Sequence, residues 1–204
     1  MKRVLVLATA VAALLVPAAP ASAGLLDGCG DRALERPFLR FLDPLAYTLV
    51  PGGDFESSAG WTLTGGARIV DGNEPWKVHG ASDSHSLSLP SGSSATSPPV
   101  CIHLLDPTVR FFGVNNGSLL SLMRVDVLYN DAGGRQRTLL GGLAPGTGTW
   151  LPTLPYLFLE NALQVLSLDG LTTQVRFRFT PTNILLGSGK WRIDDVYVDP
   201  LKIW

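Results

Sequence analysis

Charged residues are scarce in this chain, and those present do not gather into blocks of one sign. Only 16% of its 204 residues are Asp, Glu, Lys or Arg, and 16 basic residues nearly balance 17 acidic ones. A protein that follows a phosphate backbone needs a basic patch or stripe, and none is present. The composition therefore excludes a nucleic-acid partner held by general electrostatic attraction.

Long apolar runs are lacking after the first residues, which excludes a later membrane-spanning helix. The exception is Val4–Val16, which follows Lys2-Arg3 and precedes the small residues Ala21-Ser22-Ala23. This pattern predicts a signal peptide over residues 1–23, cleaved before Gly24, and hence a secreted, soluble protein. A membrane anchor is the competing interpretation, but the run is short and ends in prolines and small residues.

Cysteine is limited to Cys29 and Cys101, and neither has nearby His or Cys at metal-binding spacing. Disulfides persist in exported proteins, so the sequence predicts a bridge between these two residues. The alternative is a catalytic or metal-binding thiol. A bridge would tie the beginning of the exported chain to its main body.

Helical patterns are also rare, whereas 22 Gly and 15 Pro divide the chain into short pieces. We predict an N-terminal arm over residues 24–46, irregular or briefly helical, because its prolines prevent a long helix. Residues 47–204 are predicted to form one all-β domain, an antiparallel β-sandwich of jelly-roll type. The Ser-rich stretch 91–99 is interpreted as a loop inside this domain.

Two segments show the alternation of a half-buried strand most clearly. In residues 122–129, one face carries Met123, Val125, Val127 and Tyr129. The opposite face carries Arg124 and Asp126. In residues 174–180, Val175, Phe177 and Phe179 oppose Arg176 and Arg178. Side chains alternate across a strand, so each segment has one face in the core and one in water. Residues 130–134, Asn-Asp-Ala-Gly-Gly, are typical of a hairpin turn.

Catalytic motifs are absent, and we predict that the protein is not an enzyme. Its three histidines lie in no zinc-binding motif, and no G-x-S-x-G or P-loop sequence occurs. Asp83-Ser84-His85 has the residue types of a catalytic triad, but neighbours on a strand point to opposite faces. A glycosidase needs two facing carboxylates, and Asp126, Glu160 and Asp169 lie in separate segments. A hydrolase whose residues converge only in space remains the alternative.

Oxygen-rich motifs mark both ends of the predicted domain. The first is Gly52-Gly53-Asp54-Phe55-Glu56, with Trp61 shortly after it. The second is Ile193-Asp194-Asp195-Val196-Tyr197-Val198. This arrangement indicates that the first and last strands lie side by side and share a cation.

These motifs resemble those of the calcium-stabilised jelly-roll carbohydrate-binding modules of secreted glycoside hydrolases, within the galactose-binding-like superfamily. Such modules open with N-G-D/G-F-E followed by Gly-Trp, matched here by Gly52–Glu56 and Gly60-Trp61. They close on I-D-D-V-x-V, matched by Ile193–Val198. Asp83–Leu89 resembles their early strand, so the similarity extends over residues 47–199.

The resemblance implies a structural Ca²⁺ between the opening and closing strands. Its implied ligands are Glu56 and Asp194, with backbone carbonyls from Gly52 to Asp54 as further oxygens. On a regular strand Asp195 would point away from Asp194, so we expect only Asp194 to bind the ion. Val196 and Val198 would then share the face of Asp194. The alternative is a solvated acidic edge with no metal.

A ligand surface is harder to place, because the motifs say nothing about the sugar-binding face. Exposed aromatic rings stack on sugars, and Trp76, Trp150 and the terminal Trp204 are the candidates for such rings. Trp61 and Trp191 are expected in the core. Four polar residues of the alternating segments form a second candidate set that would suit an acidic glycan: Arg124, Asp126, Arg176 and Arg178.

The predicted function is therefore a secreted, non-catalytic binding module for a glycan such as a polysaccharide. A structural or protein-interaction β-sandwich without sugar binding is the alternative, since one fold can serve many functions.

Overall fold

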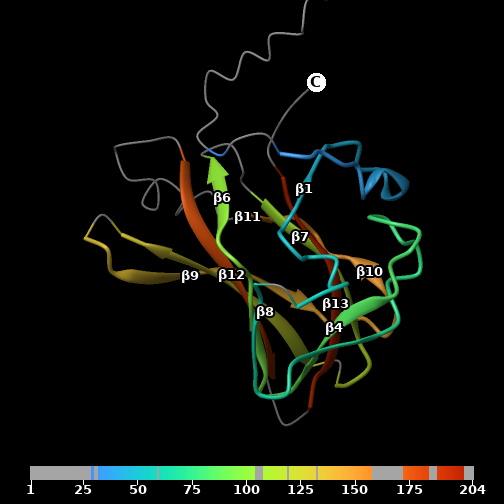
Figure 1. Cartoon of the computed structure of the whole chain (residues 1–204). Coiled ribbons are helices and arrows are strands. Elements are labelled where there is room, and N and C mark those ends of the chain that lie inside the picture. The colour runs from blue at the N-terminus through green and yellow to red at the C-terminus, as the bar shows by residue number, and fades with distance from the viewer. Residues whose placement is uncertain are drawn as a thin grey trace, which may run out of the picture.

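The computed structural model describes residues 29, 32–58, 60–103, 108–118, 120–131, 133–157, 172–183 and 188–199. The predicted signal peptide, residues 1–23, lies outside this part of the chain. The described residues form two antiparallel sheets packed face to face (Figure 1), which confirms the predicted β-sandwich. They contain no helix long and apolar enough to cross a membrane.

The first sheet has the strand order β10-β7-β13-β4-β3, with β1 paired to β13 and β11 paired to β7. The bounds of these strands, in chain order, are β1 Thr48–Leu49, β3 Arg68–Asp71, β4 His85–Pro90, β7 Thr108–Asn115, β10 Leu151–Pro152, β11 Tyr156–Leu157 and β13 Lys190–Asp199.

The second sheet has the order β2-β5-β12-β8-β9, with β6 paired to β12. Its strands are β2 Thr62–Thr64, β5 Ser94–Thr96, β6 Val100–His103, β8 Ser121–Asn130, β9 Gln136–Pro145 and β12 Thr172–Asn183. The stretch interpreted as a loop, residues 91–99, therefore contains a short strand, β5. It pairs with β2 and β12, and its inward-facing Ala95 is fully buried. Backbone pairing overrides the weak strand propensity of serine here.

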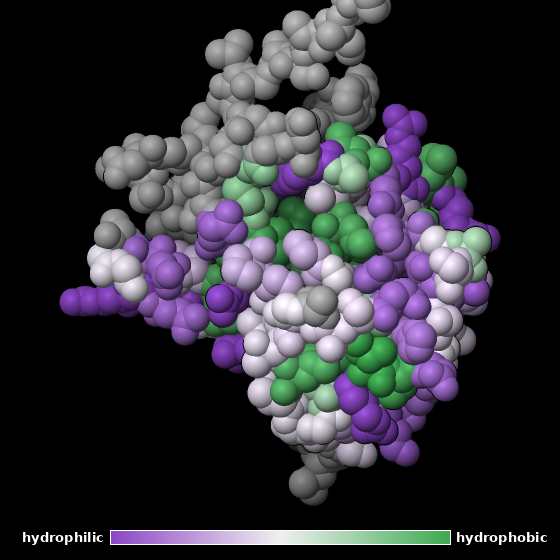
Figure 2. Space-filling model, viewed as in Figure 1, coloured by the Kyte–Doolittle hydropathy of each residue, from purple (hydrophilic) through white to green (hydrophobic). Residues whose placement is uncertain are grey.

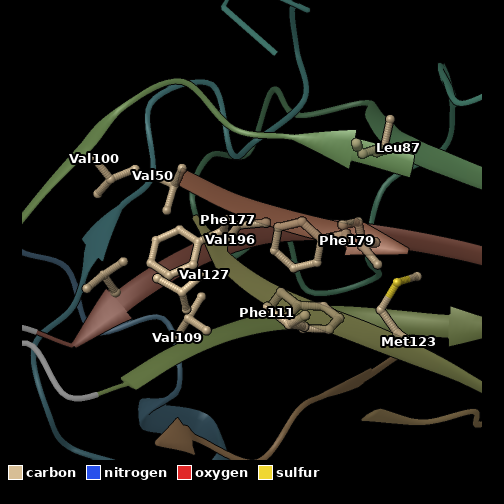
Figure 3. Packing of buried hydrophobic residues seen from close by; sticks show 14 of the residues in the cluster. Val50, Leu87, Val100, Val109, Phe111, Met123, Val127, Phe177, Phe179 and Val196 are labelled. Atoms are coloured by element: carbon tan, nitrogen blue, oxygen red, sulfur yellow. The ribbon is translucent and has the colours of Figure 1, made fainter. Parts of the chain in front are cut away.

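The core lies between the sheets and is built by the predicted alternation (Figure 3). Met123, Val125 and Val127 of β8 are buried, as are Phe177 and Phe179 of β12. The predicted core positions of Trp61 and Trp191 are confirmed, since they are 7% and 2% exposed. The predicted hairpin turn is confirmed as well, because β8 and β9 are antiparallel neighbours joined through residues 131–135.

The N-terminal arm forms a third layer on the outer face of the first sheet (blue in Figure 1). The described part of the arm contains a short 3-10 helix, η1 Leu39–Phe41, in agreement with the prediction that prolines prevent a long helix. Phe38 is fully buried against Tyr47, Phe112 and Tyr197. The predicted disulfide joins Cys29 to Cys101 on β6, so the arm is held to both sheets.

Candidate functional site

The two oxygen-rich motifs meet, as the sequence predicts. β1 pairs with the end of β13, and Val50 and Gly53 exchange backbone hydrogen bonds with Val196. A Cβ atom on Gly53 would lie 2.8 Å from the carbonyl oxygen of Val50 and 2.9 Å from that of Val196. Glycine at this position therefore allows the opening turn to approach the closing strand.

A β-bulge interrupts β13 within the Asp-Asp pair. Its register against β7 shifts between Asp194 and Tyr197, and Asp195 adopts a left-handed backbone with φ of 48°. A bulge adds one residue and re-aims the side chains around it. Both carboxylates are fully buried, so the alternative of a solvated acidic edge is wrong for this pair.

The bulge also changes which residues share a face. Val196 and Val198 belong to the core between the sheets, together with Ile193. Asp194 is opposite Phe112, whose ring packs under the arm on the outer face. The expectation that Asp194 shares a face with Val196 and Val198 is therefore wrong, because it assumed a regular strand.

Asp194 and Asp195 are buried next to each other, but only Asp194 has hydrogen-bond donors. Its oxygens accept from the backbone N–H groups of Glu74 and Asp195, both at 3.0 Å. Neither oxygen of Asp195 has a hydrogen-bond partner. Burial raises the pKa of Asp194 to about 8, and burial with the adjacent Asp194 charge raises the pKa of Asp195 to about 9.

Further acidic groups surround this pair. Glu74 is fully buried and accepts from the backbone N–H groups of Trp76 and Val78 at 2.5 and 2.6 Å. Asp83 is 5% exposed, and its Oδ2 atom and the Oδ1 atom of Asn73 are buried without a partner. Burial raises the pKa of Asp83. Unpaired buried oxygens favour either a proton or a cation.

The other predicted metal ligands are engaged elsewhere. The Glu56 carboxylate accepts from the N–H groups of Ser84 and His85 at 2.7 and 2.8 Å, and from the His85 ring at 2.9 Å. Although partial burial opposes ionisation, these hydrogen bonds lower the pKa of Glu56 to about 2. The Gly52 carbonyl accepts from Phe55 N–H. Asp54 lies 3.8 Å from His79 Nε2.

Cation binding by Glu56 and Asp194 stays a prediction, and this corner also holds oxygens that have no hydrogen-bond partner. Across the described ranges, no three His, Cys, Asp or Glu side chains are already arranged as a metal centre. The chemistry of the unpartnered oxygens nevertheless suits a hard cation, which prefers carboxylate and amide oxygens. The unpartnered oxygens at this corner belong to the carboxylates of Asp195 and Asp83 and to the side-chain amide of Asn73.

The predicted polar set on the second sheet is partly brought together. β8 and β12 are neighbours, and Asp126 is opposite Arg178. Asp126 is 2% exposed and accepts from Arg124 Nε at 2.8 Å and from an Arg178 terminal nitrogen at 3.0 Å. Arg176, exposed two residues before Arg178 on β12, contributes a further positive charge to the outer face.

A pocket of about 210 Å³ opens beside Arg176. Leu128 and Pro99 line it with apolar surface, and amide side chains contribute polar groups. The motifs do not indicate the amides, although strand alternation places Gln174 on the face of Arg176. The complete lining is Pro99, Leu128, Tyr129, Asn130, Gln136, Gln174, Val175 and Arg176.

Trp76 and Trp150 lie at the other sheet. Both are half-buried and pack against the cluster formed by the arm and Phe112. The Trp76 ring meets Phe41 edge-on at 4.8 Å, and the Trp150 ring faces the Arg192 guanidinium at 5.8 Å. The six predicted ligand residues in the described ranges therefore do not form one site, and Trp204 lies outside those ranges.

Ser84 and His85 contact each other, contrary to the expectation for strand neighbours. Ser84 lies just before β4, where alternation does not apply, and its Oγ is 3.0 Å from His85 Nδ1. Glu56 uses the same ring nitrogen, whereas His85 Nε2 lies 3.6 Å from Asp71. A relay through imidazole needs serine and carboxylate hydrogen-bonded to different ring nitrogens. Ser84 and Glu56 share Nδ1, and the 3.6 Å between Asp71 and Nε2 is too long for a hydrogen bond, so these residues do not form a catalytic triad.

No family model matches the sequence, and no curated protein sequence matches it. Similar solved structures include a xylan-binding family 22 module from Paenibacillus barcinonensis, with 14% identity and a TM-score of 0.44 over 74% of this chain and 92% of that one. A family 11 carbohydrate-binding module from a Clostridium thermocellum cellulase has 11% identity and a TM-score of 0.40, over 77% of this chain and 96% of that one.

A third similar structure holds the family 22 and catalytic modules of Clostridium thermocellum endo-1,4-β-D-xylanase 10B, complexed with xylohexaose. The identity is 12% and the TM-score 0.43, and the match covers 70% of this chain but only 26% of that one. The solved structures similar to this chain thus include carbohydrate-binding modules, the class that its terminal motifs resemble.

Proposed function

We propose that the protein is a non-catalytic glycan-binding module and that it binds through the outer face of its second sheet. The pocket beside Arg176 is the observation that carries this proposal. Its lining combines the apolar side chains of Leu128 and Pro99 with amide and guanidinium groups. Sugar rings present the same combination, apolar C–H faces bordered by hydroxyl groups.

The charge of this face favours a glycan that carries carboxylate or sulfate groups. Arg124, Arg176 and Arg178 contribute three positive charges, and buried Asp126 contributes one negative charge. Asp126 holds two of the guanidinium groups in place, whereas Arg176 is exposed at the pocket. A guanidinium can bind a carboxylate or sulfate through two parallel hydrogen bonds.

A glycan array that includes neutral, uronate-containing and sulfated polysaccharides tests this proposal. We expect binding to an acidic glycan that weakens as salt rises. The double variant Gln174→Ala with Arg176→Ala should weaken binding about tenfold or more, since it removes one neutral and one charge-assisted hydrogen bond. Arg68→Ala, an exposed arginine on β3 of the first sheet, is the matched control.

Equal binding by the double variant and the control would contradict this location. Failure of the unmodified protein to bind any glycan would favour the alternative, a structural or protein-interaction β-sandwich.

We also propose that a divalent cation, with calcium as the first choice, binds at the Asp195 corner and stabilises the meeting of β1 and β13. The unpartnered oxygens of Asp195, Asp83 and Asn73 support this proposal, as does the mutual repulsion of the buried carboxylates.

Isothermal titration of the chelator-treated protein with Ca²⁺ tests the proposed cation site. Asp195→Asn should abolish the heat of binding, whereas Asp71→Asn, an exposed carboxylate, should not. Identical titrations of both variants would exclude the site.

Export of the protein, with cleavage before Gly24, completes the proposal. The basic, apolar and small-residue order of residues 1–23 supports it. Intact-mass measurement of protein recovered from the medium tests it, and a mass that retains residues 1–23 would contradict it.

A further inference from the structure

The N-terminal arm presents apolar side chains to solvent at a place that the proposed glycan site does not use. Leu39, Leu42 and Leu45 are 54%, 95% and 37% exposed, and Leu154 in the loop after β10 is 77% exposed. We call these four residues the leucine patch. In Figure 2, apolar and strongly polar side chains lie next to each other over the arm, at the upper right of the view.

One buried arginine holds the two segments of the leucine patch together. Arg110 is 6% exposed and donates to the Asp43 carboxylate, between Leu42 and Leu45, and to the Thr153 carbonyl, directly before Leu154. Its guanidinium also stacks on the buried Phe38 ring at 3.9 Å. The patch therefore rests on a buried, hydrogen-bonded base.

Leu42 in the arm has a backbone conformation that is unfavourable for leucine. Leu42 ends η1 in a left-handed conformation with φ of 65°, where glycine or asparagine is usual. Nearly all of its side chain is exposed, so packing does not explain leucine at this position. A strained and exposed apolar residue is more easily explained by a contact outside the domain.

The described acidic side chains of the arm contact the domain, whereas two of its arginines are exposed to solvent. Both acidic residues of its described part face the domain: Glu35 accepts from the Tyr197 hydroxyl at 2.7 Å, and Asp43 binds Arg110. Arg36 and Arg40 are exposed beside the leucines. The outer side of the arm thus combines leucine with positive charge.

This combination fits a lipid surface better than a folded protein. Leucine is under-represented among the residues that dominate protein interfaces, where Trp, Tyr and Arg prevail. Membrane-surface segments instead place aliphatic side chains below the headgroups and Arg or Lys among anionic phosphates.

We propose that the leucine patch, together with Arg36 and Arg40, is a peripheral binding surface for an anionic lipid bilayer. The four leucines enter the boundary between headgroups and acyl chains, and the two guanidinium groups contact lipid phosphates. The proposed glycan face lies on the other sheet, so a membrane-bound molecule keeps that face accessible.

Vesicle flotation tests this proposal with protein purified from an exporting host, its N-terminus determined by mass spectrometry. The vesicles are phosphatidylcholine alone or with about one third phosphatidylglycerol, a content that attracts basic segments. We expect binding to the anionic vesicles only. Leu39→Ser with Leu42→Ser should weaken it about tenfold or more, because two leucines no longer leave water. Arg36→Gln with Arg40→Gln should remove the preference for anionic lipid.

The matched control is Leu140→Ser with Leu143→Ser, two exposed leucines on β9 of the second sheet, which should bind like the unmodified protein. Absence of vesicle binding by the unmodified protein would overturn the proposal, as would equal losses in the two leucine variants. If Leu39→Ser with Leu42→Ser instead abolishes a dimer seen by sedimentation velocity, without vesicle binding, the patch is a self-association surface and the proposal is wrong.

Discussion

At the residue scale, single positions in the two terminal motifs decide how the ends of the domain meet. Gly53 has no room for a side chain, because the backbone carbonyl oxygens of Val50, directly after β1, and of Val196 on β13 approach it closely. The left-handed backbone at Asp195 turns a second carboxylate into the protein. Neither property depends on residue type alone, since each is set by a neighbouring strand.

Gly53→Ala should lower the free energy of unfolding by about 1–3 kcal/mol, the usual cost of inserting a methyl group into a filled space. Gly148→Ala is the matched control, because a Cβ there would meet no atom within 4 Å, and we expect its effect to stay within about 0.5 kcal/mol. Urea unfolding measures both variants. Similar stabilities would show that the two strands are farther apart than the structure places them.

The buried acid pair predicts an unusual pH dependence in the absence of metal. The folded-state pKa values of Asp194 and Asp195, about 8 and 9, exceed the ordinary value of 3.8. Below that ordinary value both carboxyls are protonated in the folded and unfolded chains, so their contribution to stability is fully present. As pH rises towards 9, only the unfolded chain ionises freely, and the free energy of unfolding falls.

Urea unfolding in EDTA between pH 5 and pH 8 should therefore show a decline of roughly 1.4 kcal/mol per pH unit for each such carboxyl. Asp195→Asn should remove its share of this slope and leave that of Asp194, whereas Asp71→Asn should leave the whole slope unchanged. Excess Ca²⁺ should raise the stability of the unmodified protein at pH 8. A slope that Asp195→Asn does not alter would show that Asp195 is hydrated and ionised.

At the scale of elements, the arm behaves as part of the fold rather than as an appendage. Phe38 fills a space between Tyr47, Phe112 and Tyr197, and the Glu35 carboxylate accepts from the hydroxyl of Tyr197 on the last strand. The arm therefore covers apolar surface of the first sheet and leaves the second sheet open for a ligand.

Phe38→Ala should cost about 3–5 kcal/mol, the range for deleting a fully buried phenylalanine side chain. Leu39→Ala, a change at the next residue on the exposed side, should cost under about 0.5 kcal/mol. Thermal and urea unfolding compare the two variants. If Phe38→Ala lowered the free energy of unfolding no more than Leu39→Ala does, the arm would be detached from the sheet in solution.

At the scale of the whole molecule, the disulfide connects the arm to the second sheet while the arm packs on the first. Cys29 and Cys101 are separated by 72 positions, with a Cα–Cα distance of 5.5 Å. A cross-link over such a loop restricts the unfolded chain and so stabilises the folded one.

Replacing both cysteines by serine should lower the free energy of unfolding by about 4 kcal/mol in the chain-entropy description. Urea unfolding of this variant and of the unmodified protein measures the difference, with mass spectrometry to confirm the intact bridge. Two free thiols in the unmodified protein, or equal stabilities, would contradict the prediction.

Much of the sandwich is predictable from local patterns. Alternation in residues 122–129 and 174–180 predicts which side chains of β8 and β12 are buried, because strand geometry alone sets the period. The meeting of the terminal strands and the pairing of the two cysteines are also predictable from the chain. The strand β5 is not, since its Ser-Ala-Thr sequence forms a strand only through the neighbours that pair with it.

The candidate sites also have features that the sequence predicts and features that it does not. Residue types alone identify an acidic corner and an arginine-bearing strand face in this protein. Only the tertiary structure decides that a bulge turns Asp195 inward without a partner, that Glu56 binds Ser84 and His85, and that Trp76 lies under the arm. The physical reason is that side-chain direction follows from backbone pairing, and pairing joins segments far apart in the chain.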